Sequence, residues 1–182
     1  MPDAPGSDHM ERRTATELRA SAGRKLEGYA ATFGVPARIG GFTETILPGA
    51  FRASLAAGRD VLCLVDHDPS RLLGRTASGT LRLAEDSRGL HFELDMPDTG
   101  LGRDVLALAE RRDLGGMSFS FKATDEAWPA RDRRELRALD LFEVSVVHSH
   151  PAYQQTVISV RSRPVSQDDT ARRIRRLMVE LL

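Results

Sequence analysis

The 182-residue sequence has little of several things, and each shortage excludes a class of protein. The single cysteine, Cys63, excludes an internal disulfide and a cysteine-based zinc site. No apolar run approaches the ~20 residues that a membrane-spanning helix needs. The 26 basic and 26 acidic residues balance, which argues against a partner held mainly by charge, such as duplex DNA or an anionic membrane. With only 5% aromatic residues, few side chains are available to stack on bases.

Three segments are expected along the chain. Residues 1–23 are polar and have no clear apolar period, so we expect them to be disordered, and the run 6–10 resembles an expression-derived leader. No secretory signal is recognisable, which favours an intracellular protein. Residues 24–162 have the patterns and the length of one domain. Residues 163–182 read as a polar linker and an amphipathic helix, which we expect to dock on a partner subunit or to belong to a longer protein.

The main segment is predicted to be α+β and mainly β. Alternating or continuous apolar runs predict strands at 26–33, 42–47, 61–65, 79–83, 89–95, 117–124, 136–147 and 156–161. The spacing of apolar residues predicts helices at 50–56 and 101–112, with Asp98 or Thr99 as a cap of the second. Residues 128–134 are predicted to form a polar loop.

The stretch from Gly115 to Phe121 has a serine at its centre. Large apolar residues alternate with Ser118 and Ser120, so Ser118 should face away from the apolar layer. The two glycines before it allow another backbone to approach closely. An ordinary edge strand has the same pattern. A serine hydroxyl also needs a base before it can act as a nucleophile.

A histidine and a carboxylate stand at two other strands. His67 follows the apolar run 61–65 between two aspartates, where it is either a general base or a surface loop residue. Glu143 is the one charge in the apolar part of 136–147. Burying it without a partner would cost several kcal/mol. It is therefore paired, protonated or facing a cleft, unless its face of the strand is open to solvent.

Four blocks of the sequence, in this order, are similar to one protein family. Over residues 24–162 the chain resembles the prohead maturation proteases of tailed bacteriophages of the type that process a capsid with the HK97 fold. The resemblance lies in Glu27-Gly28-Tyr29-Ala30 with the segment 44–51, in Asp66-His67 followed by Leu73-Gly74-Arg75, in the block 116–121, and in 141–147 ending at Pro151-Ala152-Tyr153.

The resemblance implies a compact antiparallel β-barrel wrapped by a few helices, as in the related herpesvirus assembly proteases. It implies a serine endopeptidase without a cofactor, with His67 as general base, Ser118 as nucleophile and Glu143 as third member of the triad. The implied substrates are the scaffolding segment of the major capsid protein and the protease itself, inside assembling proheads in the bacterial cytoplasm. Self-cleavage and a homo-oligomer are implied; nucleic acid and membrane partners are not. His148 or His150 is an alternative third member if either folds back towards His67.

Two other functions fit the same residues. His148 and His150 alternate on an extended segment, and with His67 and its flanking aspartates they could bind a metal such as zinc in a metal-dependent hydrolase. The other alternative is a catalytically inactive capsid scaffold protein with the same fold. The presence of His67, Ser118 and Glu143 argues against it.

Overall fold

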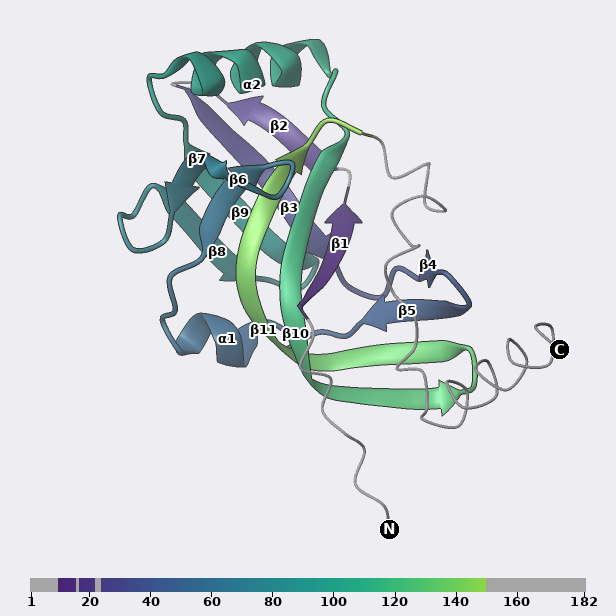
Figure 1. Cartoon of the computed structure of the whole chain (residues 1–182). Coiled ribbons are helices and arrows are strands. Elements are labelled where there is room, and N and C mark those ends of the chain that lie inside the picture. Colours follow the sequence, from purple (N-terminus) through teal and green to yellow (C-terminus); the bar gives the residue numbers. More distant parts are fainter. Residues whose placement is uncertain (1–9, 16, 22–23, 150–182) are drawn as a thin grey trace, which may run out of the picture.

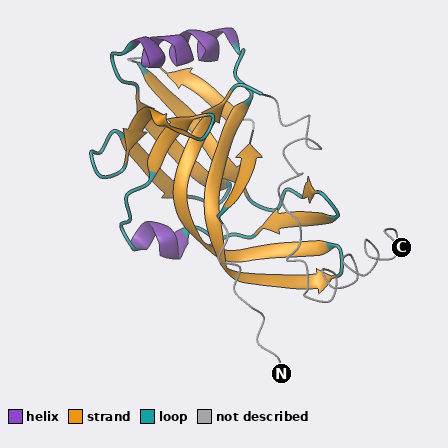
Figure 2. Ribbon diagram, in the orientation of Figure 1, coloured by secondary structure: helices purple, strands orange, loops and turns teal. Residues whose placement is uncertain are grey.

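A computed structural model of the chain describes residues 10–15, 17–21 and 24–149 (Figure 1). Figure 2 shows that strands make up most of these residues. They form a seven-stranded and a four-stranded sheet. Neither helix in the described part of the chain is long and apolar enough to cross a membrane.

The seven-stranded sheet is organised around one long hairpin. Its strands β10 (Gly116–Ala130) and β11 (Arg133–Val147) pair antiparallel and are joined by the turn at 131–132. The sheet order is β1 (Glu11–Ala15), β10, β11, β5 (Phe42–Ile46) and β4 (Ala37–Ile39). The first part of β11 pairs in parallel with β5, and its last part pairs in parallel with β6 (Leu62–Val65). β6 also pairs antiparallel with β7 (Asp68–Arg75).

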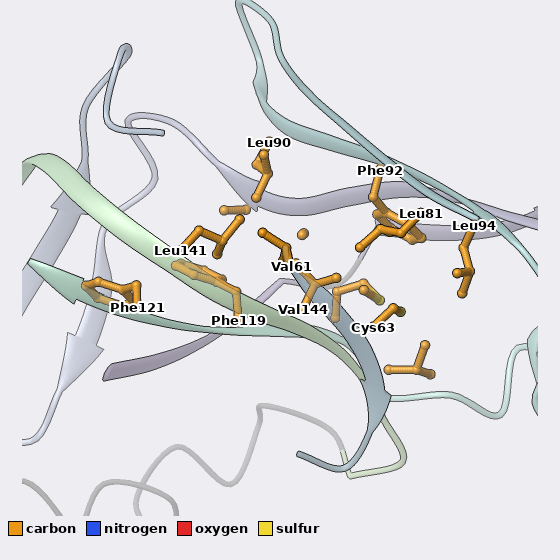
Figure 3. Packing of buried hydrophobic residues seen from close by; sticks show 14 of the residues in the cluster. Val61, Cys63, Leu81, Leu90, Phe92, Leu94, Phe119, Phe121, Leu141 and Val144 are labelled. Carbon is orange, nitrogen blue, oxygen red and sulfur yellow. The ribbon is translucent and has the colours of Figure 1, made fainter. Parts of the chain in front are cut away.

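The second sheet covers one face of this hairpin. Its order is β2 (Glu17–Ser21), β3 (Lys25–Thr32), β9 (Gly89–Asp95) and β8 (Leu81–Glu85). Buried apolar side chains of both sheets form one core (Figure 3). From the hairpin come Phe119, Phe121, Leu141 and Val144, and from the second sheet come Leu81, Leu90, Phe92 and Leu94. All of them have 2% or less of their surface exposed, so the inner face of the hairpin is rigidly packed.

Two helices join the strands. α1 (Arg52–Ala56) packs on β11, and the buried Ser54 accepts a hydrogen bond from the Leu141 N–H at 2.8 Å. α2 (Gly100–Arg111) begins at Thr99, whose side chain accepts a hydrogen bond from the Gly102 N–H, as the sequence predicted. Its buried residue Val105 belongs to the core.

Several expectations need correction. The segment 1–23 was expected to be disordered, but it contains β1 and β2. β1 pairs with the distant strand β10, and β2 pairs with β3, the next strand of the chain. The loop expected at 128–134 is the end of the β10–β11 hairpin. The described strands form two open sheets, and β11 pairs in parallel with two of its neighbours, β5 and β6. The antiparallel barrel is therefore not confirmed. The strand expected at 156–161 and the helix within 163–182 lie outside the described residues.

Candidate active site

β10 presents Ser118 on the face opposite the core. Met117 and Phe119 on either side of it are buried in the core, and the Phe119 ring stacks on Phe121 with 5.3 Å between centroids. Ser118 and Ser120 therefore point the other way, as the period of two predicted. Gly116 begins the strand with φ +135, a conformation that L side chains rarely adopt. The packed aromatic rings fix the strand, and through it the position of the serine.

β11 places Glu143 on the same face as Ser118. The ladder pairs Ser118 with Ser145 and Ser120 with Glu143, and residues that are opposite each other point to the same side. The register then shifts, so that Phe121 pairs with Leu141. In a regular strand Leu141 and Glu143, two residues apart, would point to the same face, but this irregularity turns them to opposite faces. Leu141 enters the core, while Glu143 stays with the serines.

His67 lies at the tip of the β6–β7 hairpin. Val65 pairs with Asp68, so Asp66 and His67 are the two central residues of the turn. Both have a positive φ, +52 and +61, which a two-residue hairpin turn of type I′ requires and which glycine or asparagine usually supplies. The parallel pairing of β6 with the last part of β11 carries this turn to the face that holds Ser118 and Glu143.

The three predicted site residues form a continuous hydrogen-bonded chain. His67 Nε2 lies 2.8 Å from Ser118 Oγ, and His67 Nδ1 is hydrogen-bonded to Glu143 Oε1. The histidine and glutamate side chains are 14% and 12% exposed, so both are largely shielded from water. Ser145 Oγ donates a second hydrogen bond to Glu143 Oε1 at 3.1 Å. This arrangement suits proton transfer from the serine hydroxyl to the imidazole beside a stabilising carboxylate.

Comparisons with known proteins give the family of the chain. A family model described as caudovirus prohead serine protease matches residues 9–170. The chain belongs to this family. Among solved structures, the protease resembles the bacteriophage T4 capsid assembly protease gp21 with a TM-score of 0.56 and 10% identity, over 77% of this chain and 98% of that one. This likeness shows the fold. Among curated proteins, no sequence matches the protease.

A second group of residues holds the turn that carries His67. The Asp66 N–H donates to the Val146 carbonyl at 2.8 Å, and the Asp66 carboxylate accepts from the His148 N–H at 3.0 Å. His148 Nδ1 lies 2.6 Å from the same carboxylate, and Arg71 donates to it at 2.9 Å. Partial burial raises the pKa of Asp66, but the His148 hydrogen bonds and the Arg71 charge outweigh it, so this pKa lies below its ordinary value.

Sequence reasoning missed this group and the Ser145 contact. It considered His148 as a replacement for Glu143, whereas the protease pairs His148 with Asp66, the residue before His67. An Asp-His pair between two extended runs is the signal that could have indicated a two-residue turn, since aspartate tolerates positive φ.

The metal alternative finds no support in the described part of the protease. Within residues 10–15, 17–21 and 24–149, no three His, Cys, Asp or Glu side chains are grouped to hold a metal ion. Both ring nitrogens of His67 already contact Ser118 and Glu143. His150, which that alternative needs, lies outside the described residues.

Proposed function

We propose that the protease is a serine endopeptidase that cleaves the scaffolding segment of a phage major capsid protein, and itself, during prohead maturation. The observation that carries the proposal is the continuous chain Ser118–His67–Glu143, in which one ring nitrogen of His67 contacts the serine hydroxyl and the other contacts the carboxylate. Membership of the prohead protease family supports the capsid substrate. The name of the T4 protein, a capsid assembly protease, supports it as well.

The first half of the reaction forms an acyl-enzyme. With its own proton on Nδ1, shared with Glu143, His67 accepts the Ser118 proton at Nε2 as Oγ bonds to the scissile carbonyl carbon. The carboxylate stabilises the imidazolium that results. His67 then gives this proton to the leaving nitrogen, the C–N bond breaks, and the new amino terminus departs.

The second half restores the enzyme. A water molecule attacks the acyl carbon while His67 takes one of its protons at Nε2, and the proton returns to Ser118 Oγ as the ester bond breaks. The products are a carboxylic acid and the free hydroxyl. Ser145 donates to the oxygen of Glu143 that also contacts His67, so it holds that carboxylate in place through both halves.

The setting we propose is the interior of an assembling prohead in the bacterial cytoplasm. There the capsid protein, its scaffolding segment and other copies of the protease are concentrated around each active site. Enclosure would confine cleavage to the shell and favour cleavage between copies, with or without a defined homo-oligomer.

The test compares three full-length proteins: wild type, Ser118→Ala and Ser120→Ala. Each is mixed with a capsid protein that retains its scaffolding segment, with and without a chelator, and all chains are followed by intact mass. Ser120 lies on the same strand face as Ser118, so Ser120→Ala is the matched control. We expect wild type and Ser120→Ala to cleave the capsid protein with or without the chelator. We expect Ser118→Ala not to cleave it.

Other outcomes identify the alternatives. Cleavage that persists in Ser118→Ala refutes the nucleophile, and cleavage abolished by the chelator indicates a metal-dependent hydrolase. If no variant cleaves the capsid protein, even in assembled shells, the inactive scaffold protein is the better description.

A further inference from the structure

The strand β1 occupies the sheet edge directly beside the nucleophile. It pairs antiparallel with β10, with Thr14 opposite Ser118 and Arg13 opposite Phe119 (Figure 1). It is also the terminal strand of the sheet order, so no other described strand borders β10 on that side. A polypeptide bound at this edge would make the same backbone hydrogen bonds, which is how extended peptides commonly add to a sheet.

Glu11 and Arg13 of β1 belong to a buried ionic cluster. The Arg13 guanidinium binds both carboxylate oxygens of Glu44 and lies 5.2 Å from the centroid of the Phe121 ring. Two residues earlier, Glu11 accepts from Arg134 at 2.7 Å. The side chains of Arg13, Glu11, Arg134 and Glu44 are all 8% exposed or less. Arg134 also donates to Glu44 at 2.8 Å, which joins the two pairs, and to the partly exposed Glu126 at 2.7 Å.

Such a cluster discriminates between side chains better than it stabilises the fold. Removing water from paired charges costs about as much as their attraction returns, whereas one missing partner leaves a buried charge uncompensated. Without Arg13, the carboxylates of Glu44 and Glu126 would share the one guanidinium of Arg134, so a strand at this edge should bring a second cation to Glu44. Arg134 keeps two carboxylates when Glu11 leaves, so it does not require an anion from the strand.

We propose that the substrate strand pairs with β10 in the place of β1, and that Glu44 selects its sequence. In this arrangement an arginine or lysine stands one position before the residue opposite Ser118. The inference rests on the proposed peptidase function and names the substrate class of that same site. β1 of the protease itself, with Arg13 at that position, acts as a built-in substrate mimic.

Two observations favour the exchange. Ser118 is only 2% exposed, so a polypeptide reaches its hydroxyl only if a neighbouring element moves aside. β1 is able to leave alone, because β2 belongs to the other sheet and keeps its pairing with β3. Opposite residues of antiparallel strands lie roughly 5 Å apart at Cα, which brings the backbone at the position of Thr14 close to Ser118.

The test measures binding apart from cleavage. A fluorescein-labelled peptide with the sequence of residues 9–18 is titrated into the full-length Ser118→Ala Arg13→Gln protein, and its anisotropy gives the dissociation constant. The same peptide carrying R13Q is the comparison. We expect the arginine peptide to bind roughly 30-fold more tightly or better, as expected when one partner of a buried ion pair is removed.

Changes to the protein complete the test. Adding Glu44→Gln should bring the affinity ratio of the two peptides close to one. Adding Arg82→Gln, the same kind of change at an exposed ion pair on β8, should leave the ratio unaltered. Equal binding of the two peptides, a ratio that Glu44→Gln does not alter, or no binding at all overturns the proposal. The peptide comparison alone is decisive even if Glu44→Gln fails to fold.

Failure of this inference differs from failure of the proposed function. If wild type cleaves the capsid protein but the two peptides bind equally, the strand selection is wrong and the peptidase function stands. If the arginine peptide binds with the expected preference but wild type cuts neither it nor the capsid protein, the edge site stands and the peptidase function is wrong.

Discussion

The contact between Glu143 and His67 allows a prediction with a calculable size. In the proposed mechanism the carboxylate stabilises the positive charge that His67 acquires when it takes the Ser118 proton. Both side chains are largely shielded, and the two charges would be about 4 Å apart, which corresponds to about 4 kcal/mol at an effective dielectric constant of 20. Glu143→Gln removes the charge but keeps the size and most of the hydrogen bonding.

A loss of about 4 kcal/mol corresponds to roughly a 10³-fold lower kcat. KM should hardly change, because Glu143 contacts His67 and Ser145 and the missing stabilisation arises only in the transition state. The assay is steady-state hydrolysis of a peptide that spans a mapped cleavage site. The matched control is Glu93→Gln on β9, whose exposed side chain pairs with Arg82.

One result would refute this reasoning. If Glu143→Gln retains kcat within about threefold of wild type, the carboxylate does not stabilise the imidazolium. A simultaneous loss of about 10³-fold in His148→Ala would then assign the role of third member to that histidine. We expect instead a smaller loss in His148→Ala, since His148 contacts Asp66.

Four further predictions concern other residues of the protein. Asp66→Asn should lower kcat about tenfold, because the turn loses charge-assisted bonds to His148. Since the pKa of Asp66 is lowered in the folded state, its contribution to the free energy of unfolding should be complete above about pH 4 and disappear as the pH falls further. Cys63 should resist Ellman's reagent until the chain unfolds, because burial, with the nearby acidic charge, raises the pKa of its thiol to about 12. Ser54→Ala should lower the free energy of unfolding, measured in urea, by about 1 to 3 kcal/mol, because the buried Leu141 N–H loses its acceptor.

These predictions have the following controls and refuting outcomes. The control for Asp66→Asn is Asp68→Asn, on the other side of His67. The Asp68 carboxylate binds Ser70, so this change should leave kcat close to wild type. Rapid labelling of native Cys63 would contradict the burial argument. The control for Ser54→Ala is Ser78→Ala at an exposed turn, which should change the free energy of unfolding by less than about 0.5 kcal/mol. If Ser54→Ala changes it equally little, the Leu141 N–H has found another hydrogen-bond acceptor.

The sequence predicted those parts of the site that depend on local pattern. Alternation placed Ser118 opposite the core, and the apolar run 61–65 delivered His67 at its end. Both are properties of a single strand and need no knowledge of its neighbours. The position of Glu143 relative to Leu141 was beyond such reasoning, because it depends on a register shift between two strands.

The strand β1 was missed for a different reason. Arg13 and Glu11 look like solvated charges in the sequence, and only their partners make burial possible. Those partners, Glu44 and Arg134, lie 31 and 123 residues further along the chain. Local composition therefore indicated disorder for a segment that long-range ion pairs hold in the sheet.

The way in which the triad is divided between elements has a consequence for folding. Ser118 and Glu143 belong to one hairpin closed by a short turn, so their alignment forms with little loss of chain entropy. His67 is 51 and 76 residues away from them and arrives through a parallel pairing, a kind of contact that forms slowly. We expect a newly made chain to hold its serine and glutamate in place before it gains its base. In the proposed mechanism, such a chain cannot activate its serine until β6 docks on β11, so we expect it not to cleave the proteins around it.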